Sequence, residues 1–397
     1  MKREQGSVKS LTALQPLAAM LTILIAGLCA SLWTNTSAAQ QRDAIVQNDI
    51  AVDPAGVASL REKAQEKAQE KTRIALLLPA RKAALADAAA AVQAGFLAAV
   101  QADTHSNVSI FLYETSDDIQ TNLSQYRKAQ AAAQLVVGPL ARNITSALAS
   151  AATVPTIALS PMPADGTAAL SPLLLSMGLS IEDEAHQLAQ WAHATEAPGR
   201  AWILSTNASW QRRAAHAFQQ ELRKKGRPAN LIEIRVADGV LDPERLSQLR
   251  EQAHGAAPAL ILLALDYQQA IQLREALGAE VPLYGTSQLN PFTAAQWEDA
   301  EPQPQLEGLR LLEIPCRLQQ GLDVSGEAAN PDFDRLQALG RDAYEIMLPI
   351  LAGQQHFSID GDTGQLEIDF SGPVRFSRKL TPAQYENGRV IALPETP

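Results

Sequence analysis

The sequence predicts an α/β protein with two lobes, each a doubly wound parallel sheet flanked by helices, and a β-hairpin tail. Three observations predict this architecture. Apolar runs of strand length alternate with helical patterns over residues 73–161, and the same alternation starts again over residues 181–290. After Gly353 the sequence changes to short alternating runs separated by glycine-containing turns.

The first unit begins with an apolar strand at residues 74–78, which Pro79 ends, and Arg81 lies in the loop that follows. A strand at residues 108–113 and a helix at residues 119–133 come later in the unit. Between the two strands, one helix face carries Leu85, Val92, Phe96 and Val100. The order β-α-β-α-β predicts a parallel sheet.

The stretch QLVVGPLARNITSALASAATVPTIALSP at residues 134–161 is the most informative part of the chain. It reads as a buried strand at residues 135–137, a turn at Gly138, a helix, and a second strand that ends at Ser160. Ligands of open α/β sheets meet the loops after the carboxyl ends of the strands. Gly138 and Ser160, together with Arg81, are therefore candidate residues of a binding cleft.

A second α/β unit repeats this order. Its helices and strands are predicted at residues 181–194, 201–204, 210–225, 231–236, 242–255, 259–265, 267–277 and 282–284. Thr206, Asp266, Thr286 and Ser287 follow the ends of its strands, so they are the further cleft candidates. Two similar units in succession predict two lobes with a cleft between them.

The C-terminal part is predicted to be a helix at residues 332–351 followed by short strands at residues 357–359, 365–369 and 374–379. The chain is long enough for two domains with cores of their own. We expect residues 73–176 and 284–345 to form the first lobe, and residues 177–283 and 346–397 to form the second.

Residues 1–39 read as a secretory signal peptide. A basic start precedes an apolar run at residues 17–33, and Ser37-Ala38-Ala39 offers small residues for cleavage after Ala39. An uncleaved membrane anchor is the alternative, because the apolar run is long for a signal peptide. Cys29 follows Ala26-Gly27-Leu28, an imperfect lipoprotein box, and acylation there would tether the protein by a lipid.

Residues 40–72 are predicted to be a linker. Residues 60–71 repeat Glu-Lys-Ala-Gln with a period of four and no apolar stripe, which predicts a solvated, charged helix. The formal net charge is −10, and loss of residues 1–39, which carry three basic side chains and one acid, would make it −12. This charge argues against a nucleic-acid partner. Cys316 would then be the one remaining cysteine, so no internal disulfide is expected.

The sequence offers no pattern typical of a catalytic or metal site. Asp362-Thr363-Gly364 matches the aspartic protease tripeptide, but that chemistry needs two such carboxylates and one copy is present, so a hairpin turn is the better interpretation. Glu182 and His186 stand four apart on a helix, which is fewer ligands than zinc requires. The sequence also has no nucleophile elbow and no phosphate-binding glycine loop. We therefore expect no cofactor and no enzymatic activity.

Several short pieces, taken in their order along the chain, carry a family resemblance. They are IALLLP, Ala94-Gly95-Phe96, VVGPL, YGTSQL, LEGLRLLEIP at residues 306–315, LGRDAY at residues 339–344, DTGQL at residues 362–366 and the downstream Arg378. The order of elements resembles the type I periplasmic binding protein fold. Within that fold the chain is similar to penicillin-binding-protein activators of the LpoA/LppC type. The known activators of this type carry a helical-repeat domain before the α/β module, whereas this chain has a linker there.

The resemblance implies an exported, non-enzymatic regulator that binds and stimulates a bifunctional penicillin-binding protein, a peptidoglycan synthase. It implies a periplasmic location, with membrane contact through the N-terminal segment or through a lipid that anchors the protein to the outer membrane. The alternative is a periplasmic solute-binding protein for an amino acid or related small molecule, whose cleft would use Ser160, Thr206, Asp266 and Thr286. Each of these side chains is as readily a helix cap or a turn residue.

Overall fold

The computed structural model of the protein describes residues 71–162, 171–255, 257–278, 280–292, 304–319 and 331–394. The predicted signal peptide with its cleavage site at Ala39, the lipidation candidate Cys29, and all but the end of the predicted linker lie outside the described residues. Ala68–Pro397 form one compact unit, to which every element described below belongs.

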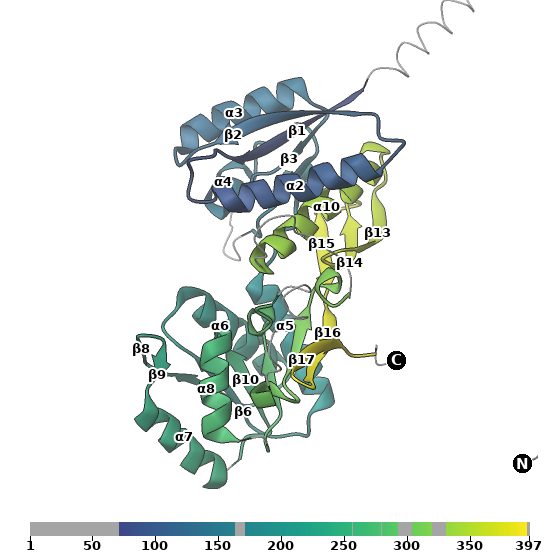
Figure 1. Ribbon diagram of the computed structural model, residues 1–397. Helices are drawn as coiled ribbons and strands as arrows, with labels where there is room; N and C mark the ends of the chain where they lie inside the picture. The colour runs from purple at the N-terminus through teal and green to yellow at the C-terminus, as the bar shows by residue number, and fades with distance from the viewer. Residues whose placement is uncertain are drawn as a thin grey trace, which may run out of the picture. The chain divides into compact units, whose positions relative to one another are not determined.

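The first lobe is built on a parallel sheet with the strand order β2-β1-β3-β4-β5 in the described residues (Figure 1). Its strands are β1 (Thr72–Pro79), β2 (Val108–Thr115), β3 (Leu135–Val137), β4 (Thr156–Ala158) and β5 (Leu174–Ser176). The helices between them are α2 (Ala86–Ala102), α3 (Ile119–Ala132) and α4 (Arg142–Leu148). Successive residues of β1 enter different apolar clusters, Leu76 on the α2 side and Leu77 on the α3 side, so helices cover both faces as predicted.

The second lobe has a larger sheet with the order β17-β16-β12-β11-β10-β6-β7 in the residues that the structure describes. Its parallel strands are β6 (Ala201–Ser205), β7 (Ala229–Glu233), β10 (Leu260–Ala264), β11 (Leu283–Gly285) and β12 (Arg310–Glu313). β16 (Thr381–Glu386) and β17 (Arg389–Ala392) add to it antiparallel. Helices α5 (Ile181–Thr195) and α6 (Ser209–Lys224) cover one face, while α7 (Pro243–Gly255) and α8 (Tyr267–Leu277) cover the other.

Short elements complete this lobe. β8 (Val236–Ala237) and β9 (Val240–Leu241) form a small hairpin, so the predicted strand at residues 231–236 is instead the end of β7 and the start of β8. Within the described residues, three 3₁₀ turns follow later in the chain, η1 (Ser287–Leu289), η2 (Pro304–Leu306) and η3 (Pro315–Arg317).

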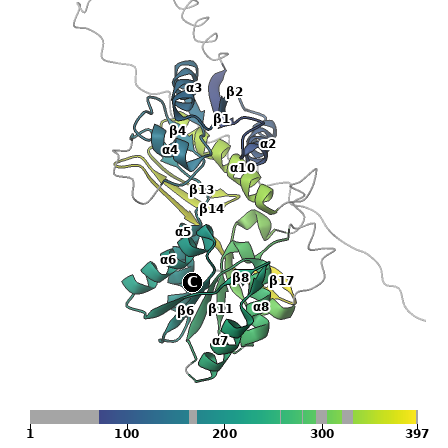
Figure 2. The ribbon, with the colours of Figure 1, turned by 90° about the vertical axis from the view of Figure 1, so that its left-hand side faces the viewer.

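The last part of the chain belongs to both lobes. Helix α10 (Pro331–Leu351) packs on α2 in the first lobe, and the two helices lie side by side in both views (Figures 1 and 2). β13 (His356–Gly361), β14 (Gly364–Asp369) and β15 (Arg375–Lys379) form the predicted antiparallel tail, which packs on the same core. After Leu380 the chain enters β16 and so returns to the second lobe.

The predicted division of the chain between the lobes is wrong in two places. We expected residues 284–345 in the first lobe, but β11 pairs with β10 and β12 pairs with β11 in the sheet of the second. We expected residues 346–397 in the second lobe, but Phe357, Leu366 and Ile368 of the hairpin tail fill the core of the first. The reason is that a short apolar strand fits either sheet, and its own sequence does not determine which sheet it joins.

Two glycines allow α10 to pack closely on α2. A Cβ atom added at Gly340 of α10 would lie 2.1 Å from the backbone oxygen of Val92, and one added at Gly95 of α2 would lie 2.0 Å from that of Gln337. Both glycines fall in pieces that carry the family resemblance. Their common reason is the close approach of two helix backbones, which leaves no room for a side chain.

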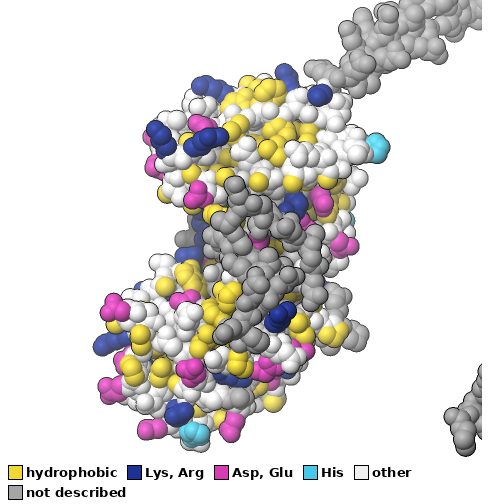
Figure 3. All heavy atoms as spheres, viewed as in Figure 1, with side chains coloured by type: hydrophobic (Ala, Val, Ile, Leu, Met, Phe, Trp, Pro, Cys, Tyr) yellow, Lys and Arg dark blue, Asp and Glu magenta, His cyan; other side chains and the backbone are white. Residues whose placement is uncertain are grey.

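On the face shown in Figure 3, Lys and Arg side chains alternate with Asp and Glu side chains over both lobes. Hydrophobic side chains gather on the first lobe between α3 and α2 in this view. Phe111 and Leu112 of the edge strand β2 are 43% and 50% exposed. Within the described ranges, no helix is both long enough and apolar enough to cross a membrane.

The helix contact gives a first prediction. Replacing Gly340 by alanine should destabilise the protein by about 1–3 kcal/mol, because the new methyl group meets backbone that cannot move away as a side chain can. Gly372→Ala is the matched control, since a Cβ there meets nothing within 4 Å. Urea unfolding of the two variants measures the difference, and equal midpoints would contradict the close approach of α2 and α10.

Candidate functional site

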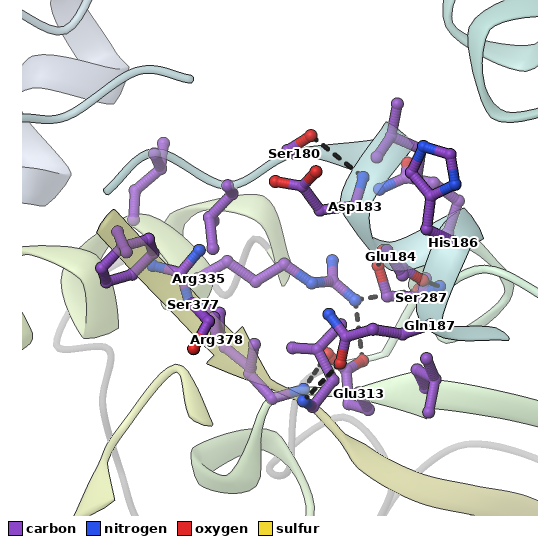
Figure 4. A pocket seen from close by; sticks show the side chains of 18 residues that line it. Ser180, Asp183, Glu184, His186, Gln187, Ser287, Glu313, Arg335, Ser377 and Arg378 are labelled. Carbon is purple, nitrogen blue, oxygen red and sulfur yellow. Dashed lines mark hydrogen bonds and ion pairs between the residues drawn. The ribbon is translucent and has the colours of Figure 1, made fainter. Parts of the chain in front are cut away.

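A cleft of about 560 Å³ lies where the chain passes between the lobes. Side chains from the start of α5, the ends of β11 and β12, the first turns of α10, and the passage from β15 to β16 line it (Figure 4). The wall is apolar on several sides and includes Leu179, Leu312, Leu336 and Phe376. Charged side chains from both lobes meet beside it, and they determine the electrostatics of the site.

The carboxylate of Glu313, at the end of β12, is at the centre of these charges. Its side chain has no exposed surface, yet it accepts four hydrogen bonds. The donors are Arg335 Nη2 at 2.8 Å, Arg317 Nε at 3.2 Å, Asn290 Nδ2 at 2.8 Å and the Ile314 N–H at 2.9 Å. Burial by itself raises the pKa of Glu313, but the charges of Arg335 and Arg317, together with the hydrogen bonds from the Ile314 N–H and Arg335, hold the pKa below its usual value.

A second buried acid, Glu184 in the first turn of α5, accepts hydrogen bonds from Ser287. Ser287 donates its backbone N–H to one carboxyl oxygen and its hydroxyl, at 3.0 Å, to the other. Burial raises the pKa of Glu184 to about 7, the hydrogen bond from the Ser287 N–H acts in the opposite direction, and the nearby Glu313 charge adds to the rise. Glu184 is therefore the acid of this site that changes charge near neutral pH.

The first turn of α10 brings charges of the first lobe to the same place. Arg335 donates to Glu313 and, at 2.9 Å, to the backbone oxygen of Ser287. Asp334 accepts from Arg317 Nη1 at 3.2 Å, and Arg317 also donates to the backbone oxygen of Asn290 at 3.0 Å. Each side therefore contributes one acid and one arginine, and all four of these charged side chains are buried.

A second polar cluster holds the hairpin of the tail. Asp342 of α10 accepts from the N–H groups of Asp362 and Thr363, at 2.7 and 2.9 Å, and from the Thr363 hydroxyl. Arg378 of β15 donates to that hydroxyl at 2.9 Å and to the backbone oxygens of Met177 and Gly178, at 2.7 and 3.0 Å. The tail and α10 are thereby joined to the segment that leads from β5 to α5.

The protease-like tripeptide thus has a structural role. Gly361 pairs with Gly364 across a turn made of Asp362 and Thr363, so the hairpin interpretation is confirmed. Cys316 is buried, and burial raises the pKa of its thiol to about 12, which makes it a poor nucleophile. In the described ranges, no group of three or more His, Cys, Asp and Glu side chains is placed to hold a metal ion.

Among the predicted cleft residues, Ser287 lines this cleft, and Thr286 is next to it in the chain. Thr286 is fully buried, and its hydroxyl has no hydrogen-bond partner. Sequence reasoning missed Glu184, Glu313 and Arg335. The available signal was a set of charged residues inside otherwise apolar strand and helix patterns, at positions that face the core.

The remaining predicted residues do not line this cleft, and three of them bond to local partners. The Ser160 hydroxyl lies 2.6 Å from that of Thr145, and Thr206 accepts from the Ala208 N–H at 3.3 Å. Asp266 forms a capping box with Gln269 at the start of α8. Gly138 has a φ of 111°, and a Cβ there would lie 2.1 Å from the Leu77 oxygen, while Arg81 is exposed in the loop after β1.

Comparison with known proteins identifies relatives of this chain. Residues 52–388 match the sequence profile of a family described as "LppC putative lipoprotein". The penicillin-binding protein activator LpoA of Vibrio cholerae is 26% identical over 344 residues, which cover 75% of this chain and 54% of that protein. The chain therefore spans about half the length of the curated relatives it matches.

Two solved structures share the fold. The C-domain of LpoA from Haemophilus influenzae, a regulator of PBP1A, superposes with a TM-score of 0.66 at 19% identity, covering 81% of this chain and 100% of that one. A protein from Chromobacterium violaceum described as a "putative branched-chain amino acid ABC transporter" gives a TM-score of 0.64 at 31% identity, covering 79% of this chain and 100% of that one. The predicted periplasmic-binding-protein-like α/β fold is confirmed.

The raised pKa of Glu184 gives a second prediction. In the unfolded chain a glutamate titrates near about 4.3, so between that pH and about 7 the folded protein keeps a proton that the unfolded chain has lost. The free energy of unfolding should therefore fall as the pH rises through this window, by up to about 1.4 kcal/mol per pH unit. Glu184→Gln should remove this component, because glutamine does not titrate.

Urea unfolding of both proteins from about pH 4.5 to 7.5 measures this effect. The stability of the parent protein relative to Glu184→Gln should fall with rising pH and become constant above about pH 7. Parallel pH profiles would show that Glu184 titrates in the folded protein as it does in the unfolded chain.

Proposed function

This chain belongs to the LppC family, and we propose that it is an exported, non-enzymatic regulator that binds and stimulates a peptidoglycan synthase of the penicillin-binding class. The names of its relatives support this function, since one is called a penicillin-binding protein activator and another a regulator of PBP1A. The chain covers about half of the curated relatives, so the activity of the whole relative is carried over here as a proposal.

The observation that carries the proposal is that most of the side chains predicted to bind a ligand instead form hydrogen bonds within the protein. The Ser160 hydroxyl is paired with Thr145, and Thr206 and Asp266 accept bonds from the backbone of the turns that they begin. Thr286 is fully buried. A cleft that held an amino acid would need such hydroxyl and carboxylate groups to face the ligand. The local bonds of Ser160, Thr206 and Asp266 favour a protein partner over a small solute.

A location in the cell envelope accompanies the proposal. The family description names a lipoprotein, and the sequence has a basic start, an apolar run and a cysteine at position 29. We propose that the protein is periplasmic and that the charged repeat at residues 60–71 gives the folded unit its reach toward a partner, from a lipid anchor if Cys29 is acylated.

The third prediction tests the partner directly. The chain from Gln40 to Pro397 should bind a bifunctional penicillin-binding protein of its host and should raise the rate at which that enzyme polymerises or cross-links peptidoglycan. Biolayer interferometry measures the binding, and turnover of the lipid-linked precursor measures the rate. A matched variant that lacks residues 62–71 should bind with the same affinity, because this repeat has no apolar stripe to contribute.

The same preparation tests the solute-binding alternative, which the likeness to the Chromobacterium protein favours. A ligand that binds only the folded state at a hundredfold excess over its Kd stabilises that state by about 2.7 kcal/mol. Under the proposed function, thermal unfolding with each amino acid should show no such shift. Failure to bind any host synthase, together with a clear shift for one amino acid, would replace the regulator with a solute-binding protein.

A further inference from the structure

We propose that the first turn of α10 forms an ionic clamp with the end of β12 and η3, and that this clamp fixes the orientation of the two lobes. The clamp consists of Asp334 and Arg335 on the first lobe and of Glu313 and Arg317 on the second. It would prevent the hinge closure by which periplasmic binding proteins enclose a ligand. This inference rests on the contacts alone and is independent of the proposed partner.

The pairs of the clamp are crossed. Arg335 of α10 reaches Glu313 at 2.8 Å, and Asp334 of α10 receives Arg317 at 3.2 Å. The side chains of Glu313 and Arg317 are 0% and 2% exposed, and those of Asp334 and Arg335 are 8% and 9% exposed. A rotation of one lobe against the other would have to break both pairs at once.

The four charged side chains can fix the orientation of the lobes because they are buried. A buried ion pair adds little net stability, since the loss of hydration offsets the attraction, but a buried charge without its partner costs several kcal/mol. Glu313 and Arg317 also pair with each other at 3.2 Å, whereas a shifted lobe would take Asp334 and Arg335 away from these partners. The clamp therefore specifies an orientation more than it adds stability.

Both sides of the clamp are held by rigid parts of their own lobe. On the first lobe, Gly340 lets α10 pack directly against α2 one and a half turns beyond Arg335. On the second, Glu313 also accepts from the Ile314 N–H and from Asn290, and Arg317 donates to the backbone oxygen of Asn290. Movement of the clamp would consequently move the lobes themselves.

Apolar packing and a backbone hydrogen bond also join the lobes next to the clamp. Ala338 of α10 packs with Ile314 and Cys316 in a small buried cluster. The Cys316 N–H donates to the Asp362 oxygen at 3.2 Å, which joins η3 to the turn of the hairpin tail. The clamp is therefore the charged part of a junction that is also closed by apolar side chains.

The fourth prediction measures the orientation of the lobes. Spin labels at Lys128→Cys on α3 and Glu251→Cys on α7, both exposed, report the distance between the lobes by double electron–electron resonance. In the chain from Gln40 to Pro397, the buried Cys316 should not react with the label, since its thiol is protonated. The parent protein should give one narrow distribution, unchanged in about 1 M salt because buried pairs are screened little.

The double variant Glu313→Gln/Arg335→Met removes both charges of the Arg335–Glu313 pair, and Arg317, which also loses Glu313, keeps its pair with Asp334. Its distance distribution should broaden and shift, while its circular dichroism stays that of the parent. Asp334→Asn is a milder second variant, for which a smaller broadening is expected. Arg375→Met is the matched control. It also removes an arginine from an ion pair, but this pair lies within the first lobe and the Arg375 side chain is 74% exposed.

Two results would overturn the clamp. One is a folded double variant with the distribution of the parent, because the lobes would then be held by other contacts. The other is a broad distribution in the parent itself, or one that contracts when an amino acid is added, because the lobes would then already move. The second result is informative even if the variants fail to fold.

Discussion

The arrangement of the lobes depends on the hydrogen bonds and ion pairs that the buried carboxylate of Glu313 forms. A carboxylate without exposed surface is stable only if hydrogen bonds and opposite charges replace its lost water. Arg317 and Arg335 supply the charge, and the Ile314 N–H with Asn290 supplies further donors. Because these groups come from the end of β12, η3, the segment after η1 and α10, satisfying one carboxylate brings several distant segments together.

The sequence pieces that carry the family resemblance have a common physical reason. YGTSQL and LEGLRLLEIP supply Ser287 and Glu313 to the clamp region, while LGRDAY and DTGQL supply Asp342 and Thr363 to the second polar cluster. Arg378 joins that cluster to the segment before α5. In this chain these pieces therefore have structural roles, and their presence does not by itself mark a catalytic or ligand-binding site.

Local sequence was enough for most elements but not for their assembly. The apolar strands, the capping aspartate Asp266 and the hairpin turn at Asp362 follow from patterns within a few residues. The hairpin of β16 and β17 could also have been predicted, because Asn387-Gly388 is a turn signal and both residues have positive φ values of 53° and 74°. The lobe assignment and the clamp pairs could not, since a charged residue inside an apolar pattern, such as Arg335, marks a position that faces the core but does not show which buried acid it meets.

Hydrogen exchange at single backbone amides tests most directly whether buried carboxylates hold this junction. The N–H groups of Ser287, Ile314 and Thr363 each donate to a buried carboxylate, whereas those of Ser371 and Gly388 donate to acids at exposed turns. The account predicts that the first three exchange as slowly as core strands, because the carboxylates that accept from them are buried at the junction or under the hairpin tail, and water reaches these bonds when those contacts open. Exchange as fast as at Ser371 and Gly388 would contradict it, since the junction would then open without unfolding of the protein.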